Sequence, residues 1–574
     1  MARRNWLGPH GGCGWRCAML AVAVIFGAAA PNAFAQSFRE FWTARVDGAA
    51  EEEVDFNLKI DSEGNIVTVG WVYTPIGQYD LLVRKYDRVG RLLWTVTHDG
   101  TAHGDEQFGS LAIDSNDHII VSGTTNELAS GDDMTTIKID PNGQILWVRR
   151  YNGALNANDG GFGIESVGVD AANHIYVTGY ETGLSGHLEC VTVKYGPNGA
   201  VQWVRQYRGT NPLDPSAVGW VNVVTPNGEV YVGGGVYSQT GGHDYAILKY
   251  NSGGTLLWDR IFDSPYHGSD SIYAIALDAA ENVFVTGISE SQHLVGDFEY
   301  STVKYNSAGV FQWEGRYGGP HGFHYGWLVA PDHAGGAYVS GASMTTGGEY
   351  DIGTVHYDSS GSTTWTATYR DYRYFGDDWA YDLAIDTNGD LIVVGHGWRG
   401  FGRGDDAYLL RYSPTGALLD EVIVDGTARG DDLWYAVEIA DSGRIVMCGT
   451  SLGLGTSTDS FVAKYTSDPP ALLTVSPDPL LARQTATFTL TNIEPDTDCY
   501  LAYSVQGPGA IFVPFLNVSI SLQSPVQAGP VVTSDANGIA VWNLFIPGSA
   551  TGLSVWLQAA HYDETSNVVE TQVN

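Results

Sequence analysis

Residues 382–395 read Asp-Leu-Ala-Ile-Asp-Thr-Asn-Gly-Asp-Leu-Ile-Val-Val-Gly. This stretch is a short apolar run, a four-residue turn and a second apolar run that ends in glycine. The second run recurs along the chain at intervals of 53 to 56 residues. Its closing glycines are Gly70, Gly123, Gly179, Gly234, Gly287, Gly341, Gly395 and Gly449. Self-similarity at a nearly fixed period of this length predicts a repeat fold built from one supersecondary unit.

Each of the eight copies reads as four strands. The two runs of the opening stretch are the first and second strands, and the third strand ends in Lys-Tyr in most copies, as at Lys194-Tyr195. A tight turn such as Asp140-Pro-Asn-Gly143 follows, where glycine suits the positive φ that hairpin turns need. The fourth strand carries a tryptophan in most copies: Trp94, Trp147, Trp203, Trp258, Trp313 and Trp365. In the seventh copy Asp420 takes this place.

The two ends of the repeat region complete each other. The last copy stops after its third strand, at Tyr465, and the missing fourth strand stands near the start of the chain as Phe41-Trp42-Thr-Ala-Arg-Val-Asp-Gly48. Such a split unit closes a ring and removes exposed sheet edges. We therefore predict an all-β fold in which residues 36–468 form an eight-bladed β-propeller closed by an N-terminal strand. A linear array of sheets is the alternative, but it would not explain the split unit.

The repeat resembles a known family. Its pattern, W-x-x-x-Y-G, then D-x-x-x-x-I-A-x-D-x-x-G-N-x-Y-V-T-G, then K-Y-x-x-x-G-x-x-x-W, is similar to the bacterial SBBP (seven-bladed β-propeller) repeat family. The resemblance covers about four-fifths of the chain after the expected signal peptide. It implies an exported propeller, usually with no assigned activity. Eight units depart from the seven in the family's name.

A basic residue recurs near the end of the third strand. The set is Lys85, Lys138, Lys194, Lys249, Lys304, Arg411 and Lys464, with His356 in the remaining copy. A charge repeated in every unit indicates a partner that stabilises the blades, because a catalytic site needs an asymmetric constellation.

The N-terminus predicts export. Arg3, Arg4 and Arg16 form a basic region, an apolar run from Ala18 to Ala30 follows, and Ala33-Phe34-Ala35 fits a signal-peptidase site. We expect residues 1–35 to be a signal peptide and the protein to be secreted, periplasmic or on the cell surface. The Arg3-Arg4 pair leaves general secretory and twin-arginine export both open.

The C-terminal part has a different pattern. Residues 466–470 read Thr-Ser-Asp-Pro-Pro, a linker composition. Period-two runs such as Ala486-Thr-Phe-Thr-Leu490 then alternate with turn residues. We predict that residues 472–574 form a small β-sandwich domain, with attachment or spacing as its expected role by analogy.

The net charge of the chain argues against some classes of binding partner. The chain has 65 acidic and 29 basic residues, a formal net charge of −36. Nucleic acid and anionic membranes are therefore poor partners, since phosphate binding needs a basic surface. No apolar stretch after the signal is long enough for a transmembrane helix. We expect a monomer whose partner is a protein or a glycan.

No motif of a propeller enzyme is complete. Asp358-Ser-Ser-Gly-Ser-Thr-Thr-Trp365 is one residue too long for a sialidase Asp-box, and Asp87-Arg-Val-Gly-Arg-Leu-Leu-Trp94 is too short for a quinoprotein motif. We favour a non-enzymatic binding or surface scaffold protein that presents loops on a rigid ring. A carbohydrate-active hydrolase or lyase, or a quinoprotein-like oxidoreductase, is the alternative. Asymmetric residues in copies six and seven are the candidate ligand site: Tyr372, Tyr374, Trp398, Arg399 and Arg403.

Acidic residues recur in two loops that lie on one face of such a ring. The loop before the first strand carries the candidate metal ligands Asp105, Asp159, Asp214, Asp270, Asp377 and Asp431. The loop entering the third strand carries acids such as Asp80 and Asp244. One interpretation is that each carboxylate accepts hydrogen bonds from its own loop. The other is that some of them bind Ca²⁺, a hard cation that prefers carboxylate oxygens.

Replacing Ala33 and Ala35 with bulky residues should block processing of the signal peptide, because signal peptidase needs small side chains there. Protein beginning near Gln36, assayed by N-terminal sequencing, should disappear from the envelope and the medium. Unmutated protein found uncleaved in the cytoplasm would refute the export prediction.

Overall fold

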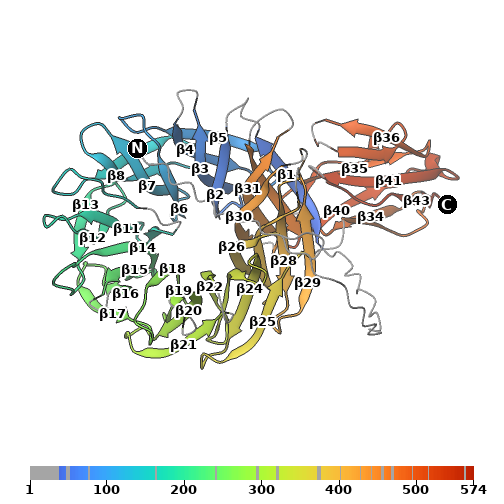
Figure 1. Cartoon of the computed structure of the whole chain (residues 1–574). Coiled ribbons are helices and arrows are strands. Elements are labelled where there is room, and N and C mark those ends of the chain that lie inside the picture. The colour runs from blue at the N-terminus through green and yellow to red at the C-terminus, as the bar shows by residue number, and fades with distance from the viewer. Residues whose placement is uncertain are drawn as a thin grey trace, which may run out of the picture. The chain divides into compact units, whose positions relative to one another are not determined.

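A computed structural model describes most of the chain after the first 37 residues (Figure 1). The described residues are 38–46, 52–74, 78–161, 165–238, 242–291, 297–318, 322–371, 376–400, 403–426, 428, 430–440, 443–453, 458–466, 471–493, 495–514, 516, 518–561 and 564–574. The signal peptide expected at residues 1–35 lies outside them.

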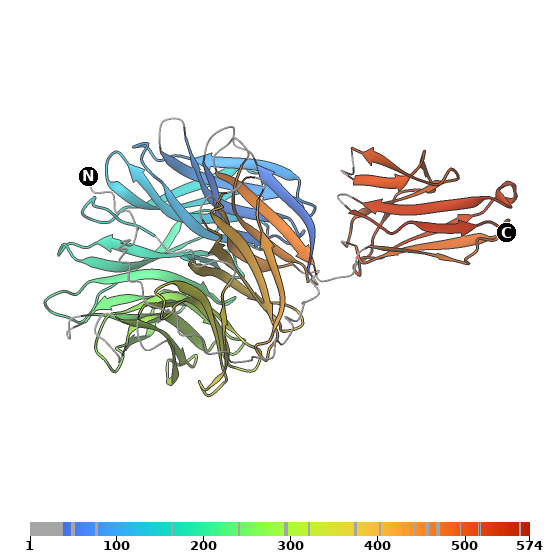
Figure 2. The same cartoon turned by 45° about the vertical axis from the view of Figure 1, so that its right-hand side comes forward.

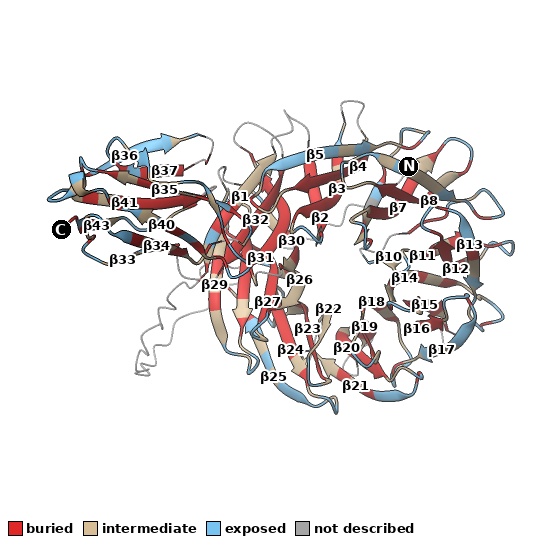
Figure 3. Ribbon diagram, turned by 180° about the vertical axis from the view of Figure 1, so that it is seen from behind, coloured by how far each residue is buried: buried red, intermediate tan, exposed pale blue. Residues whose placement is uncertain are grey.

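The described residues before the C-terminal part form eight four-stranded antiparallel sheets. In each sheet the strands follow chain order, except that β1 (Arg39–Val46) pairs with β32 (Thr458–Thr466) as the fourth strand of the last sheet. The first strands of neighbouring sheets contact one another in a closed series, and they lie innermost in the ring (Figures 1 and 3). This arrangement is a β-propeller, the fold class that the repeat predicts.

Each strand has a fixed position within its sheet. The first strands are β2 (Glu53–Ile60), β6 (Gln107–Ile113), β10 (Val167–Val169), β14 (Ala217–Val224), β18 (Asp270–Leu277), β22 (His324–Pro331), β26 (Asp378–Ile385) and β30 (Asp432–Ile439). The second strands are β3 (Ile66–Tyr73), β7 (Ile119–Glu127), β11 (Ile175–Thr182), β15 (Val230–Tyr237), β19 (Val283–Glu290), β23 (Ala337–Met344), β27 (Leu391–Trp398) and β31 (Ile445–Leu452). The third strands before β32 are β4 (Tyr79–Tyr86), β8 (Gly131–Ile139), β12 (Leu188–Tyr195), β16 (His243–Tyr250), β20 (Phe298–Tyr305), β24 (Tyr350–Tyr357) and β28 (Asp405–Tyr412). The fourth strands, besides β1, are β5 (Leu92–His98), β9 (Ile145–Tyr151), β13 (Val201–Tyr207), β17 (Leu256–Phe262), β21 (Phe311–Tyr317), β25 (Thr363–Tyr369) and β29 (Leu418–Val424).

The core lies between neighbouring sheets, in the second and third strands. In β3 and β4 almost every side chain is buried, because both faces of these strands meet another sheet (Figure 3). The fourth strands are less buried, and β5 and β25 are largely exposed. This gradient explains why the second strands read as continuous apolar runs, while the outer strands mix apolar and polar residues.

The fourth-strand tryptophan fastens one sheet to the next. The indole of Trp94 donates a hydrogen bond to the Pro141 carbonyl at 3.0 Å, in the turn between the third and fourth strands of the following sheet. The same ring covers Gly143, where φ is +87° and a Cβ would lie 2.9 Å from the indole. Only glycine meets both demands. The equivalent donors are Trp42, Trp147, Trp203, Trp258, Trp313 and Trp365.

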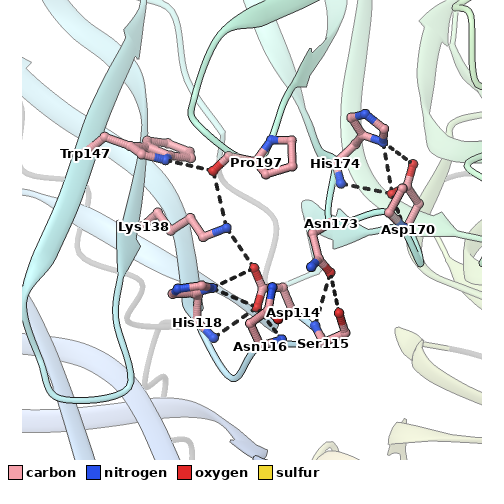
Figure 4. Close-up of polar contacts among 11 residues, drawn as sticks. Asp114, Ser115, Asn116, His118, Lys138, Trp147, Asp170, Asn173, His174 and Pro197 are labelled. Atoms are coloured by element: carbon pink, nitrogen blue, oxygen red, sulfur yellow. Dashed lines mark hydrogen bonds and ion pairs between the residues drawn. The ribbon is translucent and has the colours of Figure 1, made fainter.

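The repeated lysine joins the same contact. Lys138 Nζ lies 2.7 Å from Asp114 and 3.4 Å from the Pro197 carbonyl, which also accepts the Trp147 indole N–H (Figure 4). Lys138 is buried, so its charge needs this partner. Lys85, Lys194 and Lys249 repeat the arrangement with acids of their own sheets. The prediction that this position is architectural is confirmed.

The copy that lacks the tryptophan adjoins the sheet formed by both ends of the repeat region. The last sheet joins β32 to β1 by pairing alone, so it has no hairpin turn for an indole to cover. Asp420 instead pairs with Arg411, whose guanidinium lies 4.9 Å from the ring centroid of the buried Phe38. The exception at Asp420 therefore follows from the position of the chain ends.

The C-terminal residues form sheets of their own, coloured orange to red in Figure 2. One sheet has the order β33-β34-β40, a second is built on β35 and β41, and β36 pairs with β37. Their elements are β33 (Leu472–Ser476), β34 (Thr485–Thr491), β35 (Asp498–Ser504), β36 (Pro508–Val513), β37 (Val518–Leu522), β38 (Val526–Gln527), β39 (Val532–Thr533), β40 (Ala540–Phe545), the 3-10 helix η1 (Gly548–Ala550), β41 (Ser554–His561), β42 (Glu564–Thr565) and β43 (Val569–Gln572). Phe488 and Trp542 of the first sheet share one buried core with Leu501 and Leu557 of the second.

Two further features of the described residues are the state of the cysteines and the helix content. Cys190, Cys448 and Cys499 are buried and form no disulfide, which agrees with a packing role for these thiols. Among the described residues, no helix has the length and apolar character needed to cross a membrane.

Replacing Trp42 with alanine should lower the free energy of unfolding by about 3–5 kcal/mol, the usual cost of deleting a buried tryptophan. Trp42 is 3% exposed and donates to the Arg88 carbonyl at 3.1 Å, so the variant weakens the junction that β1 closes. Urea unfolding followed by circular dichroism measures the change. Leu93→Ala on the exposed face of β5 is the matched control. Equal midpoints for the two variants would mean that β1 does not hold the ring.

Candidate functional site

Six aromatic side chains gather on the innermost strands of the ring. Seven of the eight first strands contain a register shift at which one residue is skipped by the ladder. Apart from Gly109, the skipped residues are Phe56, Trp220, Tyr273, Trp327, Tyr381 and Tyr435, which we call the aromatic collar. A bulge re-aims the side chain of the extra residue. The neighbours of Phe56 in β2 are buried and Phe56 is half-buried, so its ring leaves the core between the sheets.

The collar residues touch from sheet to sheet. The ring centroids of Phe56 and Tyr435 lie 5.2 Å apart, and those of Tyr381 and Tyr435 lie 5.1 Å apart. Tyr273 and Trp327 meet edge to face at 6.5 Å. These pairs join different first strands, so the collar is a surface made by several blades rather than by one.

The densest part of this surface lies in copies six and seven. Trp327 and Trp379 are nearly parallel, at 8° and 5.4 Å between ring centroids. Tyr325 stacks on both tryptophans, and Tyr350 contacts Trp379 at 4.8 Å. The Trp327 indole donates to the Ala380 carbonyl at 2.6 Å, which fixes the orientation of its ring. We call Tyr325, Trp327, Tyr350 and Trp379 the aromatic stack.

The stack and its surroundings are accessible. All four residues of the stack are half-buried, and neighbouring Phe323 and Tyr273 are 36% and 42% exposed. Exposed, oriented aromatic faces that touch across several strands are suited to a ligand with flat apolar faces.

The ligand residues predicted from sequence have different surroundings. Arg399 is buried, pairs with Asp371 and Asp406, and lies 5.2 Å from the ring centroid of Tyr408. It therefore neutralises acids of the fold and offers no surface to a ligand. Trp398 is half-buried and Arg403 is exposed. Tyr372 and Tyr374 lie outside the described residues.

The acidic loops do meet on one face, but the structurally equivalent residues are not all the ones that the sequence aligned. In several sheets the equivalent acid is the next residue along the chain. Asp270, Glu106, Asp378 and Asp432 are buried, and each accepts a hydrogen bond from the backbone N–H six or seven residues earlier. Asp159 does the same with Gly153. These carboxylates shape their own loops, as the first interpretation of the acids holds.

The residue preceding this position has another role. Asp105, Asp377 and Asp431 are exposed, and each accepts the backbone N–H of the first residue of a third strand in the preceding sheet. Asp214 instead bonds Ser216 and lies 3.1 Å from His187. Of the six predicted metal ligands, only Asp270 belongs to a set of converging carboxylates among the described residues.

That set consists of Asp244, Asp263 and Asp270, at the junction between the fourth and fifth sheets. One carboxylate oxygen from each lies within 4.8 Å of the others. Burial, together with the charges of Asp263 and Asp270, raises the pKa of Asp244 to about 7. Asp406, Asp425 and Asp432 converge equally at the equivalent junction between the seventh and eighth sheets.

The comparisons with known proteins are distant. No family model matches this chain. An uncharacterized WD repeat-containing protein of Acanthamoeba polyphaga mimivirus is 27% identical over 103 residues, which is 15% of this chain and only 7% of the relative. The WD40 domain of SCAP from fission yeast aligns with a TM-score of 0.40 and 10% identity, over 77% of this chain and 98% of its own. The β-propeller domain of the trilobed protease from Pyrococcus furiosus aligns with a TM-score of 0.37 and 9% identity, over 64% and 98%. At these TM-scores and identities, none of the likenesses assigns an activity to this chain.

The raised carboxyl pKa values predict how stability changes with pH. Asp244 and Glu106 lose their protons near pH 7 in the folded chain but near pH 4 when unfolded. Between these values the folded state binds more protons, so their contribution to stability falls as pH rises from about 4 to 7. Asp244→Asn should reduce this fall in Tm, measured by calorimetry in chelator, while Asp105→Asn at an exposed carboxylate should leave it unchanged. Identical slopes in wild type and Asp244→Asn would contradict the assignment.

Proposed function

We propose that this protein is an exported binding protein that holds a neutral glycan on the aromatic stack of an eight-bladed β-propeller. The observation that carries the proposal is the near-parallel Trp327–Trp379 pair, half-exposed and extended by Tyr325 and Tyr350. Sugar rings have apolar faces of similar size to an indole. Stacking on fixed aromatic planes binds them at little cost in side-chain entropy.

Charge selects the class of glycan. The net charge of −36 and the acidic loops around the stack would repel an anionic polysaccharide. Asp377 is exposed on the loop that bonds the Tyr350 backbone, so a carboxylate stands near the stack to accept hydrogen bonds from sugar hydroxyls. A neutral, hydroxyl-rich chain fits both conditions.

The nearby carboxylates favour binding over hydrolysis. Burial raises the pKa of Asp378 to about 7, a value suited to a general acid. Yet Asp378 is 3% exposed and accepts the Tyr408 hydroxyl and the Asp371 N–H, so it is committed to the loop. Asp351 is also buried and lies 3.8 Å from Arg370. A carbohydrate-active hydrolase or lyase is the alternative function of the same surface.

The proposal also assigns roles to the other parts of the chain. Residues 36–468 form the ring, whose closure by the N-terminal strand is supported by the split repeat and by the β1–β32 pairing. Residues 472–574 form a β-sandwich that spaces or attaches the ring, supported by the core shared between its two main sheets. Export follows from the signal peptide expected at residues 1–35.

Trp379→Ala should weaken glycan binding about tenfold, because a lost stacking contact of about 1–1.5 kcal/mol corresponds to that change in Kd. The probe is a panel of neutral gluco-, xylo- and manno-oligosaccharides, screened on an array and then titrated by calorimetry. Phe311→Ala, at a 49% exposed ring in β21, is the matched control and should bind as the wild type does.

Equal loss of binding in both variants, or no binding to any neutral glycan, would refute the proposal. Release of new reducing ends during incubation would identify the alternative, an enzyme acting on the same ligand.

A further inference from the structure

In half of the sheets an arginine pairs with the acid at the junction to the next sheet. An acidic residue stands at the start of each third strand, and in four sheets an arginine pairs with it. The pairs are Arg208 with Glu189, Arg316 with Glu299, Arg370 with Asp351 and Arg399 with Asp406. The three carboxylates at Asp406, Asp425 and Asp432 thus have a buried guanidinium beside them. In these four sheets the fold supplies a cation beside the acid.

The equivalent cluster of Asp244, Asp263 and Asp270 is different. Among the described residues no lysine or arginine forms an ion pair with any of the three, and the basic group that bonds the cluster is the exposed His267, 2.7 Å from Asp263. Arg316 attracts the Asp270 carboxylate without pairing with it. Asp244 is 6% exposed and Asp270 is fully buried. Carboxylates this close and this buried repel one another strongly unless a positive charge lies between them.

Two further features point to an external ligand. One oxygen of each carboxylate, Oδ1 of Asp244, Asp263 and Asp270, is buried and lacks a hydrogen-bond donor among the described residues. Asp244 and Asp263 also line a cavity of about 230 Å³ together with Asn211 and Tyr237. Buried polar oxygens without donors are rare in folded proteins, and this cavity is large enough to hold water.

We propose that Asp244, Asp263 and Asp270 bind one Ca²⁺ ion, which takes the place that an arginine holds beside the third-strand acid of four other sheets. This site is separate from the aromatic stack and does not depend on glycan binding. Ligand oxygens around Ca²⁺ at about 2.3–2.6 Å can be separated by no more than about 5 Å, which the 4.8 Å limit satisfies. The all-oxygen set selects a hard cation, and water from the cavity completes the six to eight ligands that Ca²⁺ takes.

The bound ion would stabilise the ring. Asp244 belongs to β16 and Asp270 begins β18, so the ion joins the fourth and fifth sheets. Because the ion binds deprotonated carboxylates, its affinity should rise with pH. An exported protein meets Ca²⁺ concentrations that allow even a weak site to be filled.

The test is calorimetric titration of the full chain, purified in chelator, with CaCl₂ at pH 7.5, together with thermal unfolding. We expect saturable binding and a higher Tm with Ca²⁺ than with NaCl of matched ionic strength. Asp270→Asn and Asp244→Asn should each lower Ca²⁺ affinity at least about tenfold, because each removes a charged ligand. Asp425→Asn, in the cluster that contains Arg399, is the matched control and should keep the wild-type affinity.

The aspartate variants also keep the test falsifiable if they fold differently. In chelator at pH 7.5, Asp244→Asn should be more stable than the wild type, because it removes repulsion that no ion offsets. A variant that folds normally yet gains as much Tm from Ca²⁺ as the wild type would overturn the site. So would equal effects of Ca²⁺ and matched NaCl, which would reveal screening only.

Discussion

The structure depends on one contact repeated from sheet to sheet: an indole that caps the tight turn of the next sheet. The indole N–H bonds a turn carbonyl, the ring face covers a glycine with positive φ, and the buried lysine bonds the same carbonyl. Each contact joins residues about one repeat apart, so it fixes neighbouring sheets to each other at seven of the eight junctions. The residues of the inner edge and of the loops take no part in this contact, so their side chains can differ between copies.

The sequence predicted the parts of the fold that this contact controls. Repeat length, strand order and the role of the lysines follow from residues that recur in nearly every copy. The aromatic collar could not be predicted, because the bulge that turns Phe56 or Tyr381 inward breaks the period-two alternation on which strand predictions rest. The acids were predicted on the correct face, but a shift of one residue separates exposed Asp105 from buried Glu106. Only hydrogen bonds to particular N–H groups reveal that shift.

Differences between equivalent positions in this ring are more informative than the repeats themselves. The junction acids occur throughout the ring, but their partners differ. Arg399 pairs with one cluster and the exposed His267 pairs with the other. His103 beside Asp99 repeats this arrangement at the junction between the first and second sheets, and both histidines have positive φ. The loop conformation is thus shared, while the source of positive charge varies. Copies six and seven likewise differ from the others by the aromatic stack that they carry.

The closing sheet explains why the exception to the indole contact stands where it does. A strand from the N-terminus must pair with one that ends more than 400 residues later, since Trp42 faces Lys464. Such long-range pairing is slow to form, but it covers the edge of β32 that would otherwise be free. Its cost is that the last sheet has no turn between its third and fourth strands. A tryptophan in the preceding sheet would therefore have no turn to cover. Asp420 stands at that position and pairs with Arg411, whose guanidinium lies over the ring of Phe38. The replacement of the repeated tryptophan by Asp420 thus occurs next to the sheet where the two ends of the ring meet.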